Sequence, residues 1–352
     1  MVPPQRTNPL ESANGNAELR VVAIGGGTGL STLLKGLKRY VLTPALAASG
    51  GSAIRELSGV VTVSDDGGSS GRLRKEFNML PPGDVRNCIV ALSEDEALLS
   101  RLFQHRFQKG SGLEGHSFGN LFLAALTSLT GDFAEAVRLS SEILLTRGHI
   151  YPATTSNVEL EAVFEDGSRV RGETRITASK GKIRELFLVP PDVQPLPQTL
   201  EAISCADLIT IGPGSLFTSL IPNLLVPGIV QAIVDSPAVK IYVCNLMTQA
   251  NESLDLTAAD HIRALSSHAH AQLFDYAMIN NKSASDEMKA KYALEGASQI
   301  VVDLDAIEAL GVCPVLGDYL DEGGVARHAT DRVARDLMSV MAQAPDRHAN
   351  SR

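Results

Sequence analysis

The 352-residue chain has no tryptophan and only four cysteines, at positions 88, 205, 244 and 313. No two of these cysteines form a CxxC pair, so the sequence predicts neither a zinc site nor a disulfide framework. The simplest interpretation is that they are reduced, partly buried thiols of a cytoplasmic protein.

The chain also lacks long apolar runs and an excess of positive charge. No run reaches the ~20 apolar residues that a membrane helix needs, and the polar N-terminus lacks the apolar core of a signal peptide. The net charge of −9 and the pI of about 5.4 argue against nucleic acid or an anionic membrane as the main partner. We interpret residues 1–18 and 344–352 as disordered tails and residues 19–343 as a single nucleotide-binding domain.

What the chain does contain is a repeated order of short apolar strand, glycine-rich turn and amphipathic helix. The first example is Val21–Ile24, then Gly25–Gly29, then leucines 30, 33, 34 and 37 on one helix face. Apolar strands of this kind are typical of a parallel sheet covered on both faces. The alternation predicts a Rossmann-like, doubly wound α/β fold. Further strand candidates are GVVTVS (59–64), DLITI (207–211), KIYVC (240–244), YAMINN (276–281) and QIVVDL (299–304).

Two regions depart from this order. Residues 84 to about 147 have mostly helical patterns, which predicts a helical insertion. Residues 157–189 alternate apolar and polar side chains around an Asp-Gly turn, which predicts a small antiparallel β appendage. A last helix is expected at Thr330–Gln343, with one apolar face that packs on the domain.

The glycines after the first strand predict an anion site. In open α/β sheets, ligands bind beyond the carboxyl ends of the strands. Glycine allows a close backbone approach, and the following helix offers unpaired N–H groups. Gly25, Gly26, Gly27, Thr28 and Gly29 are therefore candidate phosphate-binding residues. The pattern is neither a Walker A motif nor a clean GxGxxG, so a strand-to-helix turn without a ligand is the alternative.

A second glycine-rich stretch, SDDGGSSGRLR, follows the second strand. Asp65 and Asp66 could bind Mg²⁺, hold a ribose hydroxyl or act as a base. Gly67, Ser69 and Arg72 could contact a phosphate. A solvated acidic turn with a nearby ion pair is the alternative.

A third stretch, GPGSLFTS, has Gly212, Gly214 and Ser215 at another strand-to-helix junction. The nucleophile elbow of hydrolases is excluded, because Ser215 has a glycine two residues away on only one side. A second phosphate cradle fits better, and a plain turn is the alternative.

Polar side chains at three other junctions are candidate ligand contacts. Asp84 is expected to cap the helix that it begins. Asn120 could read a base or sugar, with helix capping as the alternative. Arg86 and Asn87 in PPGDVRN lie in the first turn of the helix that Asp84 begins and could face a ligand, and Asn120 lies at the start of the apolar helix in GHSFGNLF. Asn245 and Thr248 in CNLMTQ follow a strand directly, which suits recognition of a ligand by side-chain amides and hydroxyls.

In this order, the stretches GGGTGLSTLLKGL, VSDDGGSSGRLR, PPGDVRN, HSFGNLFLAAL, IGPGSLFTSLIPNLLVPGI and NLMTQ resemble the YvcK-like gluconeogenesis factor family. That family lies in the 2-phospho-L-lactate transferase (CofD-like) superfamily. The resemblance covers roughly residues 20–343. It implies a cytoplasmic bacterial protein that binds UDP-sugars, UDP-N-acetylglucosamine above all. It also implies a link to gluconeogenic growth, cell shape and cell-wall precursor supply.

Carried over by motif, the resemblance implies that Gly26–Gly29 hold phosphates and that Asp65 and Asp66 are the acidic pair. Asn120 and Gly214–Ser215 match other pocket positions. The transferase relatives move phospholactate from a guanylated donor to a deazaflavin acceptor with Mg²⁺. Two functions therefore stay open: a regulatory nucleotide-sugar-binding protein with no obligatory cofactor, and a phosphotransferase with Mg²⁺ at the acidic pair.

Two further expectations concern other classes and partners. An NAD-dependent oxidoreductase ranks last, because Asp65 lies about twice as far downstream as the ~20 residues expected for the ribose-binding acid. The apolar segment 220–234, LIPNLLVPGIVQAIV, suits a homodimer interface as well as a core. The sequence does not identify a regulatory protein partner.

Overall fold

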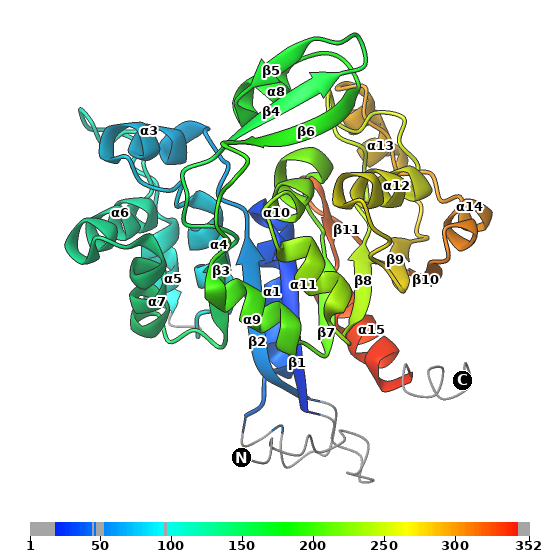
Figure 1. The fold of residues 1–352 in the computed structure, drawn as a ribbon, viewed down its shortest axis with the longest axis horizontal. Helices are drawn as coiled ribbons and strands as arrows, with labels where there is room; N and C mark the ends of the chain where they lie inside the picture. Colours follow the sequence, from blue (N-terminus) through cyan, green and yellow to red (C-terminus); the bar gives the residue numbers. More distant parts are fainter. Residues whose placement is uncertain (1–17, 44–45, 47–52, 95–96, 344–352) are drawn as a thin grey trace.

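The computed structural model describes residues 18–43, 46, 53–94 and 97–343. Apart from Glu18, the two predicted tails lie outside these residues. A seven-stranded parallel sheet forms the centre of the molecule, in the order β10-β9-β8-β7-β1-β2-β3 (Figure 1), which confirms the doubly wound α/β prediction. Its strands are β1 (Glu18–Gly25), β2 (Ala53–Val61), β3 (His149–Pro152), β7 (Leu208–Ile211), β8 (Val239–Val243), β9 (Tyr276–Asn280) and β10 (Cys313–Gly317).

The two strands that the sequence did not reveal are the edges of the sheet. The prediction of a strand at residues 299–304 is wrong, because Gln299 forms only an isolated bridge with Met247 and helix α14 begins at Leu304. The sheet ends instead in β10 on one side and β3 on the other. Each contains a proline, which lacks an N–H and is tolerated mainly on edge strands.

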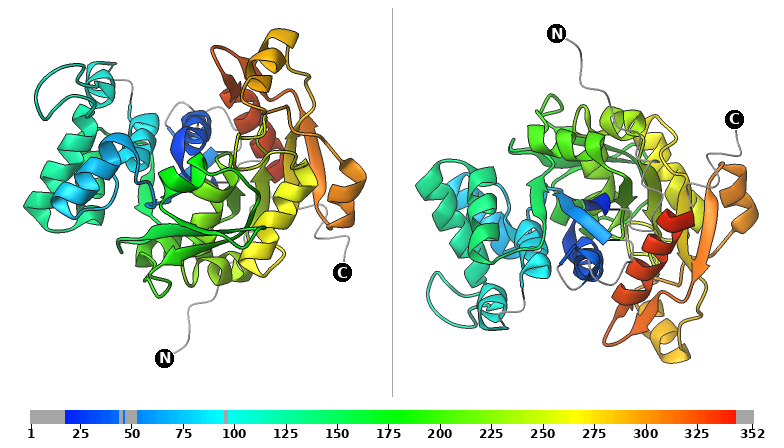
Figure 2. Two further views of the ribbon diagram at one scale, coloured as in Figure 1. Left: turned by 90° about the horizontal axis from the view of Figure 1, so that it is seen from above. Right: turned by 90° about the horizontal axis from the view of Figure 1, so that it is seen from below.

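Helices cover both faces of the sheet, as Figure 2 shows from above and below. On one face, α1 (Gly27–Leu37) packs against the sheet, α4 (Gly83–Leu92) and α15 (Thr330–Gln343). On the other face, α9 (Pro197–Cys205) packs against the sheet and α11 (Ile229–Asp235). The last helix has the bounds that its apolar spacing predicts.

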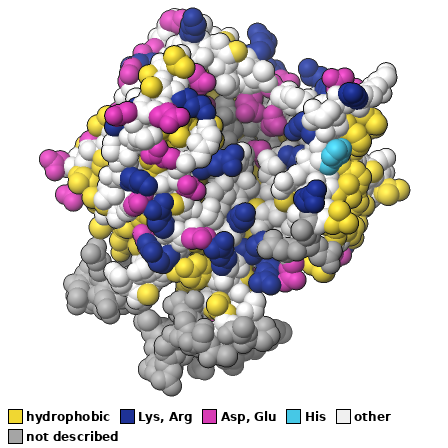
Figure 3. Space-filling model, turned by 180° about the vertical axis from the view of Figure 1, so that it is seen from behind, with side chains coloured by type: hydrophobic (Ala, Val, Ile, Leu, Met, Phe, Trp, Pro, Cys, Tyr) yellow, Lys and Arg dark blue, Asp and Glu magenta, His cyan; other side chains and the backbone are white. Residues whose placement is uncertain are grey.

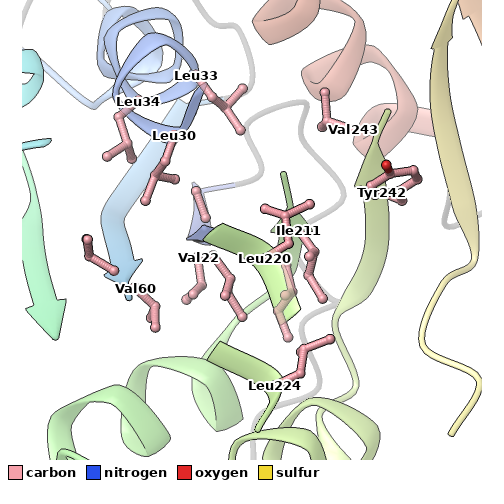
Figure 4. Close-up of a cluster of buried hydrophobic side chains, with 14 of the residues drawn as sticks. Val22, Leu30, Leu33, Leu34, Val60, Ile211, Leu220, Leu224, Tyr242 and Val243 are labelled. Atoms are coloured by element: carbon pink, nitrogen blue, oxygen red, sulfur yellow. The ribbon is translucent and has the colours of Figure 1, made fainter. Parts of the chain in front are cut away.

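Leucines approach the central strands from these two sides (Figure 4). Leu30 and Leu34 of α1 are fully buried, as is Leu220 beyond β7, and Leu224 is 4% exposed. Burial of one such side chain contributes about 1.5–3 kcal/mol. The double-sided core therefore fixes the two loops that connect β1 and β7 to the segments that follow them.

The apolar segment 220–234 belongs mainly to this core. Ile221, Ile229 and Ile233 are each 0% exposed, so these side chains are not available to a second copy of the chain. Among the described residues, no single helix is long and apolar enough to cross a membrane. One bent pair passes that test by length and composition, and it is made of the same mostly buried segments, Leu216–Leu224 and Ile229–Asp235.

The predicted helical insertion and β appendage are both present. The insertion lies at one side of the sheet, and the appendage, a sheet of order β5-β4-β6 with helix α8, lies above the carboxyl ends of the parallel strands (Figure 1). The remaining elements are η2 (Lys38–Tyr40), α3 (Gly68–Phe77), α5 (Ala97–Gln104), α6 (Phe118–Thr130), α7 (Phe133–Ile143), β4 (Glu159–Phe164), β5 (Arg169–Arg171), α8 (Glu173–Ala178), β6 (Ile183–Val189), the π-helix η3 (Leu216–Leu220), α10 (Ile221–Leu224), α12 (Ala258–Ala269), α13 (Asp286–Ala293), α14 (Leu304–Ala309), β11 (Leu320–Glu322) and β12 (Ala326–His328).

The order of the strands places a topological switch point between β1 and β7. The chain builds outward from β1 through β2 to β3, and then in the opposite direction from β7 through β8 and β9 to β10. In open parallel sheets, ligands bind in the crevice beyond the carboxyl ends of the strands at such a point. The loops after β1 and β7 are two of the predicted glycine-rich junctions.

Candidate functional site

The two glycine-rich junctions at the switch point are in direct contact. A Cβ on Gly29 would come within 2.3 Å of the carbonyl oxygen of Pro213, so only glycine allows this approach. Gly212 has a φ of +88°, and a Cβ there would lie 2.6 Å from the Val243 carbonyl oxygen. The loops of residues 25–29 and 212–215 therefore converge, and glycine makes this approach sterically feasible. The sequence also predicts that the second glycine-rich stretch, residues 65–71, joins them in one hollow, but this stretch contributes no residue to the lining of the pocket described next.

A pocket of about 620 Å³ opens between these loops. Among the described residues that line it there is no lysine or arginine. An anion in this pocket would therefore be held by backbone N–H groups and the N-terminus of α1 rather than by cationic side chains. The lining residues are Gly26, Gly27, Thr28, Gly29, Thr177, Pro213, Gly214, Ser215, Ser219, Asn245, Leu246, Met247, Thr248, Gln249, Ala250, Asn251, Glu252, Tyr292, Glu295, Ala297, Ala326 and His328.

Of the predicted site residues, eight line this pocket: Gly26–Gly29, Gly214, Ser215, Asn245 and Thr248. Gly25 and Gly212 do not line it, because they lie at the strand ends of the loops. The candidates of the second glycine-rich stretch and of the helical insertion do not line it either, and their contacts are described below.

The loop after β8 forms one wall and is tied to the second glycine junction by hydrogen bonds. The Gly214 N–H donates to the Asn245 side-chain oxygen at 3.3 Å, and the Gln249 amide donates to the Ser215 hydroxyl at 2.7 Å. The Gln249 Oε1 is buried and has no hydrogen-bond partner among the described residues. A buried amide oxygen without a partner costs free energy. A ligand that donates a hydrogen bond to this oxygen would remove that cost, because Gln249 lines the pocket.

Glu252 caps the π-helix that follows the second junction. Its Oε1 accepts hydrogen bonds from the backbone N–H groups of Phe217 at 3.0 Å and Thr218 at 2.9 Å. Burial raises the pKa of the Glu252 carboxyl, while these two hydrogen bonds oppose that rise. Glu252 therefore fixes the start of η3 and places a carboxyl group at the pocket wall.

Asp84 does not cap its own helix, contrary to the expectation from the sequence. Helix α4 begins at Gly83, and the Asp84 Oδ2 accepts a hydrogen bond of 2.7 Å from the Gly27 N–H at the start of α1. Burial raises the pKa of the Asp84 carboxyl to about 6, although the hydrogen bond from Gly27 lowers it. A carboxyl group thus satisfies a backbone donor of the first glycine loop.

Asp65 and Asp66 turn toward different partners. The Asp65 Oδ1 accepts a 2.8 Å hydrogen bond from the Gly67 N–H within its own loop. The Asp66 Oδ1 accepts from both the backbone N–H and the hydroxyl of Thr174, at 2.8 and 2.6 Å. Asp66 therefore caps helix α8 and joins the β appendage to the loop after β2.

Glu173, next to that cap, adds a carboxyl group to the same region. Burial, together with the nearby carboxylates of Asp65 and Asp84, raises the pKa of Glu173 to about 9. Its Oε2 is buried without a partner among the described residues. The face drawn in Figure 3 is hollowed near its upper end, and acidic side chains lie in that hollow.

The carboxylates do not form a metal cage by themselves. Among the described residues, no group of three or more His, Cys, Asp or Glu side chains has the arrangement of metal ligands. Because Asp65 and Asp66 diverge, the donor set does not fit a magnesium ion held by protein atoms alone. Magnesium at this pair stays a prediction from the family resemblance.

The candidates of the helical region pack against one another beside the pocket. The Arg86 guanidinium donates to the Ser117 hydroxyl and to the Asn87 side-chain oxygen. The Asn120 amide donates to the Ser69 hydroxyl at 3.1 Å. These bonds join the N-terminal ends of α3, α4 and α6. In this structure the side chains therefore hold three helices together.

Arg72 is also separate from the pocket. Its guanidinium donates to the Glu114 carbonyl oxygen at 2.7 Å, within the connection that leads to α6. Arg72 and Arg86, the two cationic side chains that the sequence predicts as phosphate ligands, therefore do not line the pocket.

Several lining residues carried no signal in the sequence. Tyr292, Glu295 and His328 come from α13, the turn after it, and β12, far along the chain from every glycine-rich stretch. Thr177 comes from α8 of the appendage. The double glycine between β11 and β12, Gly323 and Gly324, is a local signal from which a turn could have been predicted there.

The family model described as 2-phospho-L-lactate transferase CofD matches residues 21–320. The gluconeogenesis factor of Halalkalibacterium halodurans is 48% identical over 320 residues, which are 90% of this chain and 95% of the relative. The gluconeogenesis factor of Bacillus subtilis is 45% identical over 326 residues, which are 92% of this chain and 98% of the relative.

The fold is also that of a solved structure. An X-ray crystal structure of a protein from Bacillus halodurans has a TM-score of 0.86 and 47% sequence identity. The match covers 91% of this chain and 99% of the crystallised one. At this identity and coverage, the similarity concerns most of the described fold.

Proposed function

Because this chain belongs to the 2-phospho-L-lactate transferase CofD family, we propose that it binds a nucleotide sugar of the UDP-N-acetylglucosamine type in the switch-point pocket. In this proposal it is a regulatory protein of the cytoplasm, linked to gluconeogenic growth, cell shape and cell-wall precursor supply. The relatives that are named gluconeogenesis factors support the link to gluconeogenic growth.

The observation that carries the proposal is the junction of the two glycine loops in one pocket. Gly26–Gly29 form the start of α1, and Gly214 and Ser215 precede η3, so two segments rich in glycine line the same space. That arrangement suits a diphosphate, whose two charged groups lie a few ångströms apart. The N–H groups of Gly27 and Gly214 are bonded to the side chains of Asp84 and Asn245, so a phosphate would have to displace these side chains or use the neighbouring N–H groups. Gly27 and its φ of +60° leave the loop open on the pocket side.

The walls supply the polar groups that a base and a sugar need. Asn245, Thr248 and Gln249 offer amide and hydroxyl groups on one side, and Tyr292 and Glu295 offer further acceptors and donors. A pocket with few charges and many hydrogen-bonding groups is typical of a site for neutral polar groups.

Isothermal titration calorimetry tests the proposal with purified chain and UDP-N-acetylglucosamine, UDP and GDP. We expect heat with both uridine ligands and weaker binding of GDP. The absence of heat with every uridine nucleotide at millimolar concentration would contradict it.

Phosphoryl transfer is the second candidate, and the position of Asp84 favours it. A carboxyl group with a raised pKa, bonded to the first phosphate loop, is what a proton acceptor for a nucleophile needs. Metal-dependent release of a nucleoside monophosphate, lost in Asp65→Asn and Asp84→Asn, would support this function. If no nucleoside diphosphate conjugate is turned over, phosphoryl transfer is contradicted and ligand binding is the only function that stands.

A further inference from the structure

His328, in the last strand of the described fold, lines the pocket. It lies at the end of the β11–β12 hairpin and pairs in register with Leu320. Its ring lines both the main pocket and an adjoining recess of about 250 Å³ beside Thr28, Gly29 and Thr32. No feature of its local sequence indicated a ligand.

The protonation of this ring is determined by its backbone partner. The Nε2 of His328 lies 2.9 Å from the carbonyl oxygen of Cys244. A carbonyl oxygen only accepts, so Nε2 must carry the proton. Burial lowers the pKa of His328 to about 4, although the bond to Cys244 raises it, so the ring is neutral near pH 7. The other nitrogen, Nδ1, is therefore a lone-pair acceptor.

Among the described residues, no hydrogen-bond donor reaches that acceptor. The Tyr292 hydroxyl, which belongs to another lining residue, is bonded to the hairpin instead: its oxygen accepts a 3.2 Å hydrogen bond from the Ala326 N–H. His328 thus offers an oriented acceptor next to the N-terminal turn of α1, where the diphosphate of the proposed ligand would lie.

We propose that the Nδ1 of His328 accepts a hydrogen bond from a hydroxyl or amide N–H next to the diphosphate of the bound ligand. His328 then selects ligands that carry such a donor. This inference rests on the proposed function, because it assigns a specificity residue to the same pocket. The donor has two sources, the sugar beyond the diphosphate and the ribose before it.

Two substitutions of His328 test the roles of its two ring nitrogens separately. His328→Gln places an amide nitrogen near the position of Nε2, so it keeps a donor for Cys244 and removes the acceptor. His328→Asn places an amide oxygen near Nδ1, so it keeps the acceptor and removes the donor. By calorimetry we expect His328→Gln to weaken binding of UDP-N-acetylglucosamine roughly tenfold and His328→Asn to weaken it less, since a ligand donor is left unpaired only in the first.

Two further ligands identify the source. If the sugar supplies the donor, His328→Gln leaves the affinity for UDP unchanged. If the ribose supplies it, UDP also loses affinity and the 2′,3′-dideoxy analogue of UDP does not. Equal affinities of parent and His328→Gln for every ligand would overturn the inference while leaving the proposed function intact. A parent chain that binds no uridine nucleotide would overturn both.

A measurement on the parent protein covers the case in which a variant does not fold. In chain with ¹⁵N-labelled histidine, NMR should show one ring with an unprotonated Nδ1 and a protonated Nε2 at pH 7, and the Nδ1 resonance should shift on addition of ligand. A resonance that does not move at saturating ligand would contradict the proposed contact.

Discussion

The backbone N–H of Gly27 donates a 2.7 Å hydrogen bond to the Oδ2 of Asp84, a residue 57 positions further along the chain. One partner begins the helix after β1, and the other lies in the first turn of α4. The bond joins the first glycine loop to the helical insertion. Because the carboxyl group is buried there, its protonation becomes part of the stability of the fold.

Asp84→Asn should stabilise the protein at neutral pH and have little effect in acid. The pKa of this carboxyl rises from an ordinary value of 3.8 to about 6. The protonated form is favoured in the folded state, so the folded state loses stability as the pH rises from about 4 through 6. Above pH 7 the ionised Asp84 lowers the free energy of unfolding of the parent protein by at most about 3 kcal/mol, since one pKa unit corresponds to 1.36 kcal/mol.

Thermal unfolding at several pH values between 4.5 and 8 measures this effect. The difference in Tm between variant and parent should grow up to about pH 7 and then level off. Asp166→Asn is the control, because its exposed carboxyl has a pKa that the Ser168 hydrogen bonds lower. Its effect should have the opposite sign. A difference for Asp84→Asn that does not vary with pH would argue against the raised pKa.

Gly27→Val should abolish nucleotide binding while the fold survives. The φ of Gly27 is +60°, and a Cβ there meets nothing closer than the Ser219 hydroxyl at 3.8 Å. The backbone strain is about 1–2 kcal/mol, and the branched side chain would occupy the space of a phosphate. Affinity for UDP should fall at least tenfold in calorimetry.

Gly68→Val is the matched control for that substitution. Gly68 has a φ of +48°, begins α3 in the same way, and a Cβ there meets no atom within 4 Å. It does not line the pocket, so the stability cost should be similar and the affinity unchanged. Equal losses of affinity in the two variants would mean that strain, not the pocket, is responsible.

The extent to which the sequence predicts this molecule depends on how local the signal is. Val21–Ile24 and the leucines of α1 define their elements by spacing alone, and the predicted strand and helix are present. Helix α15 was predicted to the residue for the same reason. The edge strand β10 was not, because Pro314 and Gly317 remove the apolar pattern of a strand that has only one neighbour.

The site shows the same division. Glycine spacing indicated the two loops, since steric demands at Gly29 and Gly212 act within a few ångströms of the backbone. The partner of Asp84 and the role of Asp66 depend on contacts between segments 57 and 108 residues apart, which no local pattern encodes. His328 was missed because its function depends on the Cys244 carbonyl oxygen, and a backbone group has no sequence signature.

Asp66→Ala should loosen the β appendage without unfolding the sheet. The side chain supplies the only acceptor that the described residues show for the Thr174 N–H and hydroxyl at the start of α8. Loss of a helix cap costs about 0.5–2 kcal/mol. Hydrogen–deuterium exchange should increase in residues 173–178 and stay unchanged in β1 and β7. Thr174→Val, which keeps the N–H bond, should give a smaller increase, and equal exchange in parent and Asp66→Ala would refute the anchoring role.

Glu252 should tolerate glutamine and not alanine. Its Oε1 accepts the N–H groups of Phe217 and Thr218, both buried, and its residue is 6% exposed. Alanine leaves two buried donors unpaired, each at about 1–3 kcal/mol, and frees the segment that follows Ser215. Glutamine keeps one acceptor oxygen in place and removes a buried carboxyl group whose pKa is raised. Denaturant unfolding should therefore show a loss of several kcal/mol for Glu252→Ala and little or none for Glu252→Gln at pH 7. Because the second glycine loop leads directly into η3, UDP affinity should fall only in the alanine variant. A similar fall in both variants would instead mean that the carboxylate contacts the ligand.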